Sequence, residues 1–275
     1  MSRGTSGTAL SLQRRLMADS PNSIAVAISV LRAQRVRKPA PGGSADIDHS
    51  GLLPVLDTLR ESGVGGLPGE KPRLAAYREY LETVDPDELS RDAALAYWLN
   101  LYNAGALWLA AEAQHEGKAT VLRVRGGFQR PWAMTGDEEL SLHAIEHGKL
   151  RRFKDPRIHA ALVCGSASCP TLRLQPYTGT DLDAQLDEQM RSFLANGGAA
   201  VDREAQTLRL SRVFLWYGRD MTRPQRMPTF LPARKRTVAR AISAWLSDED
   251  RSWVCSTKPR VEYTTYDWGL ACSIA

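Results

Sequence analysis

The side chains best suited to chemistry gather in one short segment, residues 143–170, of this 275-residue chain. It holds three of the five histidines and two of the four cysteines, which are His143, His147, His159, Cys164 and Cys169. A thiol acts as a nucleophile only when its thiolate is populated, which requires a nearby imidazole, a helix N-terminus or another positive group. This grouping therefore indicates thiol chemistry as the first hypothesis.

Cys164 is the first candidate nucleophile, because the small residues that follow it in the sequence leave space for a substrate. Ser166 and Ser168 belong to this small-residue loop and are candidate substrate contacts. Cys169 competes with Cys164, since it precedes Pro170, and a thiolate at the start of a helix is stabilised by free N–H groups. Two other roles stay open for the pair. The cysteines are small buried hydrophobes, or they form a redox couple, although C-x4-C differs from the redox-active C-x-x-C spacing.

The candidate bases are His147 and His159, and Glu146 is the candidate residue that orients an imidazole. Read as a strand, the segment 157–164 places His159 and Cys164 on opposite faces, so His159 reaches the thiol only if the chain bends. His147 belongs to a separate predicted helix and can approach from elsewhere.

A zinc site is the competing interpretation of the same histidines. His143, Glu146 and His147 fit the H-x-x-E-H pattern of inverted zinc peptidases, in which two imidazoles four residues apart share a helix face. A catalytic zinc needs a third protein ligand, and the sequence marks none. We therefore predict no metal and no cofactor, and keep a zinc-dependent hydrolase as the second alternative.

Asn100 and Asn103 interrupt a strongly apolar helical segment, residues 90–114. Buried amides require hydrogen-bond partners, so the favoured interpretation is that they pin a loop. The alternative is that they bind substrate and help to stabilise an oxyanion.

The elements that must position these residues are helical first and mixed later. Hydrophobic content of 43% and charged content of 24% suit a globular protein with a large core. The pattern predicts an α+β fold, a single domain whose helical N-terminal half packs on a small, mostly antiparallel sheet. Beyond residue 115, short helices are predicted at 141–150, 180–198 and 235–247. Strands are predicted at 119–128, 157–164, 205–217 and 261–270.

The N-terminus differs in charge from the remainder of the chain. The first 40 residues carry seven Arg or Lys against the single acid Asp19, within a net charge of +5. We predict a flexible basic arm with a short helix over residues 1–45 and the α+β domain over 46–275. A basic arm on a near-neutral body is not typical of nucleic-acid-binding domains, so no nucleic-acid partner is predicted. A second basic cluster, 219–240, is interpreted as a solvated surface loop.

The longest apolar run near the N-terminus, residues 24–31, is far shorter than the ~20 residues that span a bilayer. It also lacks the features of a signal peptide. We predict a cytoplasmic protein without an integral membrane segment, in which all four cysteines are reduced thiols. No pattern indicates an oligomeric state.

Four blocks of the sequence, 96–104, 140–148, 155–170 and 266–270, resemble the domain of unknown function 547 family. The resemblance runs from about residue 50 to the C-terminus in the family's order. It implies a single α+β domain whose shared polar residues include Asn100, Asn103, Glu146, His147, His159, Cys164 and Cys169. The family motif usually lacks a histidine at position 143, which favours Glu146 and His147 as an orienting pair. The predicted helix and histidine-bearing strand are also similar to papain and transglutaminase-like thiol enzymes.

These residues together predict a cysteine-dependent hydrolase or acyl transferase that acts on a small-molecule or peptide-like amide. Cys164 attacks an acyl carbon, and His147 or His159 takes the thiol proton. The first alternative is a non-catalytic ligand-binding or scaffold domain, in which the same polar residues form a buried network.

Overall fold

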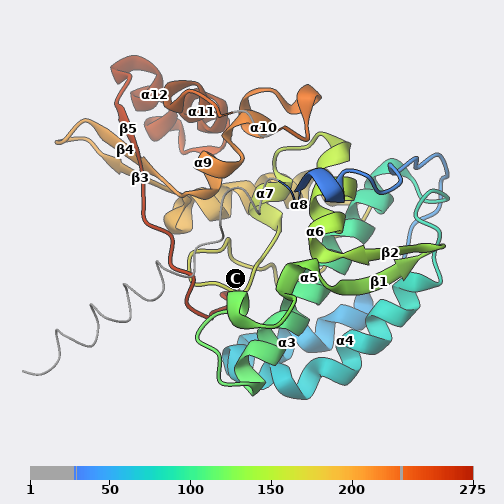
Figure 1. Ribbon diagram of the computed structural model, residues 1–275. Helices are drawn as coiled ribbons and strands as arrows, with labels where there is room; N and C mark the ends of the chain where they lie inside the picture. Colours follow the sequence, from blue (N-terminus) through green and yellow to red (C-terminus); the bar gives the residue numbers. More distant parts are fainter. Residues whose placement is uncertain (1–27, 29, 230–231, 275) are drawn as a thin grey trace, which may run out of the picture.

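The computed structural model describes residue 28 and residues 30–229 and 232–274 (Figure 1). The part of the predicted basic arm over residues 1–27 lies outside these described residues. Between residues 50 and 115, the described helices are η1 (Ser50–Leu52), α3 (Leu53–Ser62), η2 (Gly63–Gly66), α4 (Leu67–Glu82) and α5 (Arg91–His115).

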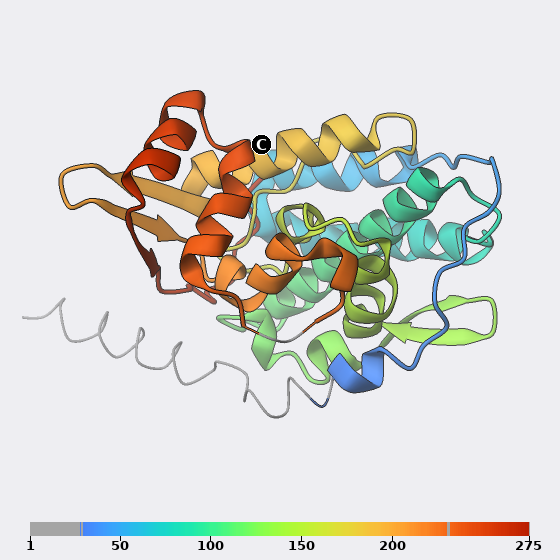
Figure 2. The same cartoon turned by 90° about the horizontal axis from the view of Figure 1, so that it is seen from above.

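Helix α5 forms the centre of the larger hydrophobic core (Figures 1 and 2). It begins where the sequence predicts, because the Ser90 hydroxyl accepts a hydrogen bond from the backbone N–H of Ala93 at 3.2 Å. The sequence predicted one buried face, whereas the helix is buried on nearly all sides. A helix that is apolar all round lies inside a protein, so α5 serves as the scaffold on which other segments are positioned.

The strands form two small sheets, which confirms the α+β class. Strands β1 (Pro131–Thr135) and β2 (Glu138–Ser141) make an antiparallel hairpin. In the second sheet, β4 (Thr207–Leu210) pairs antiparallel with β3 (Ala199–Asp202) and parallel with β5 (Arg260–Tyr263). The pairing is therefore mostly antiparallel, as predicted, but the strands are divided between two sheets.

Three helices between the sheets and four after β4 complete the fold. Those between are α6 (Leu142–Ala144), α7 (Ile158–Ala161) and α8 (Leu182–Phe193); those after are α9 (Val213–Trp216), α10 (Gly218–Thr222), α11 (Lys235–Ile242) and α12 (Asp248–Thr257). A second hydrophobic cluster lies between α8, β4, α9 and α11. Figure 1 places this unit at one end of the molecule and helices α3 and α4 at the other.

Several strand predictions are wrong. Residues 119–128 form two 3-10 turns, η3 (Val121–Arg123) and η4 (Gly127–Gln129), and residues 157–164 contain helix α7. Only the first parts of 205–217 and 261–270 are strands. Short apolar runs fit a strand and a buried helical turn equally well, so tertiary contacts decide between them.

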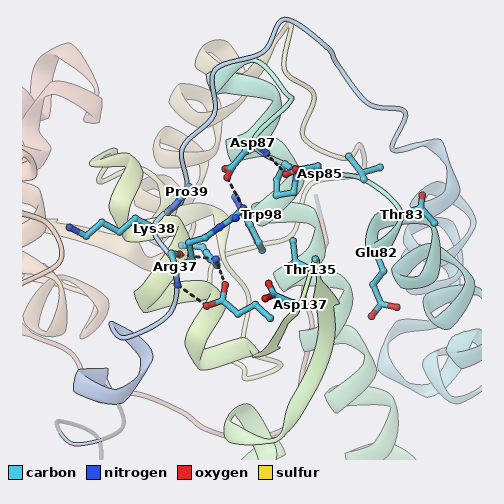
Figure 3. A pocket seen from close by; sticks show the side chains of 15 residues that line it. Arg37, Lys38, Pro39, Glu82, Thr83, Asp85, Asp87, Trp98, Thr135 and Asp137 are labelled. Atoms are coloured by element: carbon cyan, nitrogen blue, oxygen red, sulfur yellow. Dashed lines mark hydrogen bonds and ion pairs between the residues drawn. The ribbon is translucent and has the colours of Figure 1, made fainter.

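Residues 30–45 of the predicted arm contact the body of the protein. The Arg37 guanidinium forms an ion pair with Asp87 at 2.7 Å (Figure 3). The buried Lys149 ammonium donates to the Arg37 carbonyl at 2.8 Å. A cavity of about 230 Å³ lies beside Trp98, and its lining includes Arg37, Asp87 and Lys149. None of the predicted site residues lines this cavity. Within the described part of the chain, no helix has the length and apolarity needed to cross a bilayer.

Candidate functional site

Cys164 and Cys169 are joined by a disulfide, which corrects the prediction that they are reduced thiols. Gly165, with φ of +72°, lets the chain turn sharply directly after Cys164. The loop then returns, so that the two Cα atoms lie 6.3 Å apart, within the range that a disulfide spans. Both cysteines are half-buried, and the other two, Cys255 and Cys272, are free thiols.

Hydrogen-bond donors surround the two sulfurs. The backbone N–H of Cys164 donates to Sγ of Cys169 at 2.9 Å, and the buried Ser166 hydroxyl lies 2.8 Å from Sγ of Cys164. The Tyr266 hydroxyl lies 3.3 Å from each sulfur and 3.0 Å from the Ser166 hydroxyl. Among the described residues, no histidine nitrogen lies within hydrogen-bonding distance of either sulfur.

The C-terminal segment holds the cysteine loop in place. The backbone N–H of Ala167 donates to the Gly269 carbonyl at 2.9 Å, and the Ser168 hydroxyl accepts from the Asp267 N–H at 2.9 Å. In Figure 1 the chain that follows β5 runs back toward the middle of the molecule, where Leu270 pairs with Ser166. Ser168, predicted to contact substrate, is therefore bonded to main chain here.

Asn100 and Asn103 each bind main chain with both ends of the amide. The Asn103 side chain donates to the Ala161 carbonyl at 3.0 Å and accepts from the Val163 N–H at 3.1 Å. Asn100 binds both backbone groups of Tyr177 in the same way. Asn103 thus fixes the end of α7 directly before Cys164, whereas its predicted contact with substrate stays a prediction.

Glu146 and His147 lie in a buried π-helical turn, η5 (Ile145–Lys149). The Glu146 carboxylate accepts hydrogen bonds from the hydroxyl of Tyr217 at 2.5 Å and from that of Tyr102 at 3.3 Å. Its distance to Nε2 of His147 is 3.8 Å. Such π turns replace regular helix at many functional sites, and here the turn buries a carboxylate beside an imidazole.

His159 belongs to a second part of the same buried network. Its Nε2 lies 2.9 Å from Asp220, and its ring stacks on Tyr217 at a centroid distance of 3.8 Å. The guanidinium of Arg151, from the turn η6 (Leu150–Phe153), donates to both oxygens of Asp220 at 2.8 and 3.0 Å. Arg151 also lies 3.2 Å from Nδ1 of His147, which links the two histidines through one cation.

The surroundings set the charges of this network. Burial lowers the pKa of His147 to about 3, and the nearby cation of Arg151 acts in the same direction. Burial alone raises the pKa of Glu146, but the charge of His147 and the hydrogen bond from Tyr217 outweigh it and bring the pKa to about 2. At neutral pH, His147 is therefore neutral and Glu146 is ionised.

Sequence reasoning missed the residues that connect the cysteine loop to this network. They are Tyr102, Arg151, Tyr217, Asp220 and Tyr266. No role in the site was assigned to the three tyrosines, and Asp220 lies inside the segment interpreted as a basic surface loop. The one available signal was that Asp220 is the single acid among the many basic residues of segment 219–240. Such an acid is expected to be buried against a cation.

The zinc interpretation finds no complete ligand set among the residues that the structure describes. The rings of His143 and His147 meet edge to face, with centroids 4.4 Å apart. In these described parts, no group of three His, Cys, Asp or Glu side chains converges as metal ligands would. The geometry therefore gives no support to the two-histidine zinc site.

The buried histidine predicts a loss of stability in acid. Because the pKa of His147 falls from 6.5 to about 3 on folding, the unfolded chain binds an extra proton between these values. The contribution of the neutral His147 to stability is therefore fully present above pH 6.5. Below that, protonation of this histidine in the unfolded chain lowers the free energy of unfolding by about 1.4 kcal/mol per pH unit as the pH drops toward 3. We therefore expect the free energy of unfolding of His147→Gln, measured in urea at several pH values between 7 and 4, to fall less steeply with decreasing pH than that of the wild type.

The exposed His115 supplies the control for this prediction, since His115→Gln keeps the buried network. His49, whose pKa burial lowers to about 4, leaves a residual slope in every variant. Equal slopes in the wild type and in His147→Gln would contradict a neutral buried His147.

Comparison with known proteins adds a family but no activity. Residues 86–194 match the model of the family described as "Protein of unknown function, DUF547". Neither the curated proteins nor the solved structures contain a significant match to this chain. The matched range includes the cysteine loop, η5 and all of α5.

Proposed function

We propose an activity from geometry alone, because the family that residues 86–194 match, DUF547, is described as of unknown function. The proposed activity is thiol–disulfide exchange with polypeptide thiols. The single observation that supports the proposal is the bonded, half-buried pair Cys164–Cys169 with N–H and O–H donors at both sulfurs. Such donors stabilise the thiolate that leaves when a disulfide is opened.

We infer different roles for the two sulfurs from their contacts. A backbone N–H is an obligatory donor, and the one from Cys164 points at Cys169. Cys169 is therefore the better leaving thiolate, so that an incoming thiolate attacks Sγ of Cys164. Tyr266 and Ser166 add hydroxyl hydrogen bonds to whichever sulfur carries the charge.

The exchange runs in two balanced steps. A substrate thiolate attacks Sγ of Cys164, which forms a mixed disulfide and releases Cys169 as a thiolate. A second thiolate of the same substrate attacks the substrate sulfur in that bond, which forms the substrate disulfide and releases Cys164. The protein gains two electrons and the two protons lost by the substrate thiols. A low-molecular-weight disulfide, such as oxidised glutathione, takes them and restores the Cys164–Cys169 bond.

A cysteine-dependent hydrolase or acyl transferase is the second candidate. It requires reduction of the disulfide first, and then a base for the thiol of Cys164. His147 and His159 are engaged inside the buried network, which weighs against a direct thiolate–imidazolium pair. One observation favours this candidate: the Tyr266 hydroxyl contacts both sulfurs, so it can exchange a proton with a thiol there.

The test mixes the oxidised full chain with a reduced peptide that carries two cysteines, followed by alkylation and mass spectrometry. We expect one peptide disulfide and two new protein thiols, at Cys164 and Cys169, and repeated turnover once oxidised glutathione is added. A peptide that stays reduced beside an intact Cys164–Cys169 bond contradicts the proposal. Cleavage of a peptide amide by the reduced protein supports the hydrolase instead, and binding without any reaction supports a scaffold.

Tyr266→Phe is expected to slow exchange about tenfold, because the variant keeps the ring but removes a hydroxyl donor worth roughly 1–2 kcal/mol to a charged sulfur. The measurement is the rate of peptide oxidation under single-turnover conditions. Tyr263→Phe removes the hydroxyl of a half-buried tyrosine on β5 that has no contact with sulfur, and should leave the rate unchanged. Equal rates in the wild type and Tyr266→Phe would exclude a role for this hydroxyl.

A further inference from the structure

Three aromatic rings form a compact surface beside the disulfide, which we call the aromatic platform: Trp216, Tyr266 and Trp268. The ring centroids of Tyr266 lie 4.9 Å from Trp216 and 4.5 Å from Trp268, and the two tryptophans stack at 5.6 Å. Trp216, at the end of α9, is 42% exposed. A large indole held this far in solvent gains little from folding, which is typical of a surface that binds a partner.

Tyr266 connects the platform to the reactive bond. Its hydroxyl lies 3.3 Å from both sulfurs, while its ring packs against both tryptophans. The platform therefore begins one phenol ring away from Cys164 and Cys169. A group that reacts at the sulfurs can rest its neighbouring atoms on the three rings.

We propose that the aromatic platform selects the substrate, namely an extended polypeptide segment with a large apolar or aromatic side chain two residues from its cysteine. This inference rests on the exchange activity proposed above. Successive residues of an extended chain advance about 3.3 Å, so a side chain two residues from the cysteine lies about 6.6 Å along the chain. That reach matches a side chain placed on rings that start beside the sulfurs. None of the three platform side chains is charged, so the platform offers nothing to a small charged thiol such as glutathione.

The experiment compares two reduced twelve-residue peptides with two cysteines each, which carry either Phe or Ser two residues from each cysteine, and dithiothreitol as a small dithiol. The wild-type full chain is expected to oxidise the Phe peptide about tenfold faster than the Ser peptide. Trp216→Ala and Trp268→Ala should abolish this preference and lower the rate with the Phe peptide more than the rate with dithiothreitol. Tyr80→Ala, which removes an aromatic ring 43% exposed on α4, is the matched control and should retain the preference.

Absence of a preference in the wild type overturns the inference, and so does a uniform slowing of all three substrates in the tryptophan variants. A version of each peptide with Ser in place of both cysteines separates this inference from the proposed chemistry. Tighter binding of the Phe version to the wild type, by about tenfold and lost in Trp216→Ala, supports the platform even if no electrons are exchanged. Exchange with dithiothreitol but equal binding of both versions supports the chemistry and rejects the platform.

Discussion

With an oxidised peptide as substrate, Cys169→Ser is expected to stop at a mixed disulfide between Cys164 and the peptide, and Cys164→Ser is expected to form no such adduct. The reason is the hydrogen bond from the Cys164 backbone N–H to Sγ of Cys169, which makes Cys169 the leaving group and Cys164 the sulfur that bonds to substrate. By microscopic reversibility, the remaining Cys164 thiol of Cys169→Ser forms the same adduct with an oxidised peptide. Both variants should lose at least a thousandfold in turnover.

Non-reducing electrophoresis and mass spectrometry measure this result. Cys255→Ser and Cys272→Ser are the controls, because neither thiol belongs to the site. Burial raises the pKa of Cys272 to about 12, so that thiol stays protonated and unreactive. An adduct on Cys169 rather than Cys164 would reverse the assignment of the two sulfurs. Turnover that persists in Cys164→Ser would contradict exchange at this pair altogether.

Asp220→Ala is expected to destabilise the protein by about 3–5 kcal/mol, the largest stability effect of any single polar side chain here. Asp220 is fully buried and accepts from two nitrogens of Arg151 and from His159. Its removal leaves the buried guanidinium without this carboxylate, which then no longer offsets the desolvation penalty of the cation. The hydrogen bond from His159 and the charge of Arg151 lower the pKa of Asp220 against the effect of burial, so its contribution is present at neutral pH and is lost in acid.

Urea unfolding at pH 7 measures the effect. Asp137→Ala is the matched control, since Asp137 is an exposed carboxylate in the turn between β1 and β2, and its loss should change stability by less than about 0.5 kcal/mol. A loss below 1 kcal/mol in Asp220→Ala would show that the network of Arg151, His147 and His159 does not depend on this carboxylate.

The parts of the fold that sequence reasoning predicted are those with local causes. The Ser90 hydroxyl and the apolar run behind it define the start of α5 whatever surrounds the helix. The Ser141 hydroxyl, which accepts from the Ala144 N–H at 3.1 Å, likewise marks the start of α6. These signals act over three residues, and a single sequence contains them completely.

The parts that sequence reasoning did not predict have distant causes. The Asn103 side chain forms hydrogen bonds with the backbone on both sides of Leu162. The two bonded residues, Ala161 and Val163, lie 58 and 60 residues after Asn103 in the sequence. The apolar run before Cys164 contains a helical turn and then an extended stretch, instead of the predicted strand. The β1–β2 hairpin was missed because its strands are short and mixed in polarity.

The candidate site follows the same rule. The family resemblance identified Glu146, His147, His159, Cys164 and Cys169 as a group, but it could not say which of them touch. Tyr266 reaches the sulfurs from about 100 residues further along the chain, and no local pattern marks such a contact. The structure instead divides the predicted residues into a cysteine loop and a buried ionic network. The imidazoles belong to the network, so the thiol–disulfide exchange that we propose at the loop depends on hydroxyl and N–H donors.

Equilibration of the full chain in glutathione redox buffers, followed by denaturing alkylation and mass spectrometry, tests the exchange activity most directly. The account predicts that the Cys164–Cys169 bond opens and re-forms reversibly, with a midpoint between about −120 and −270 mV, the span of exchange-active disulfides. A bond that stays closed below about −300 mV, as structural disulfides do, would contradict it. So would a reduced pair that fails to re-form the bond in oxidised glutathione.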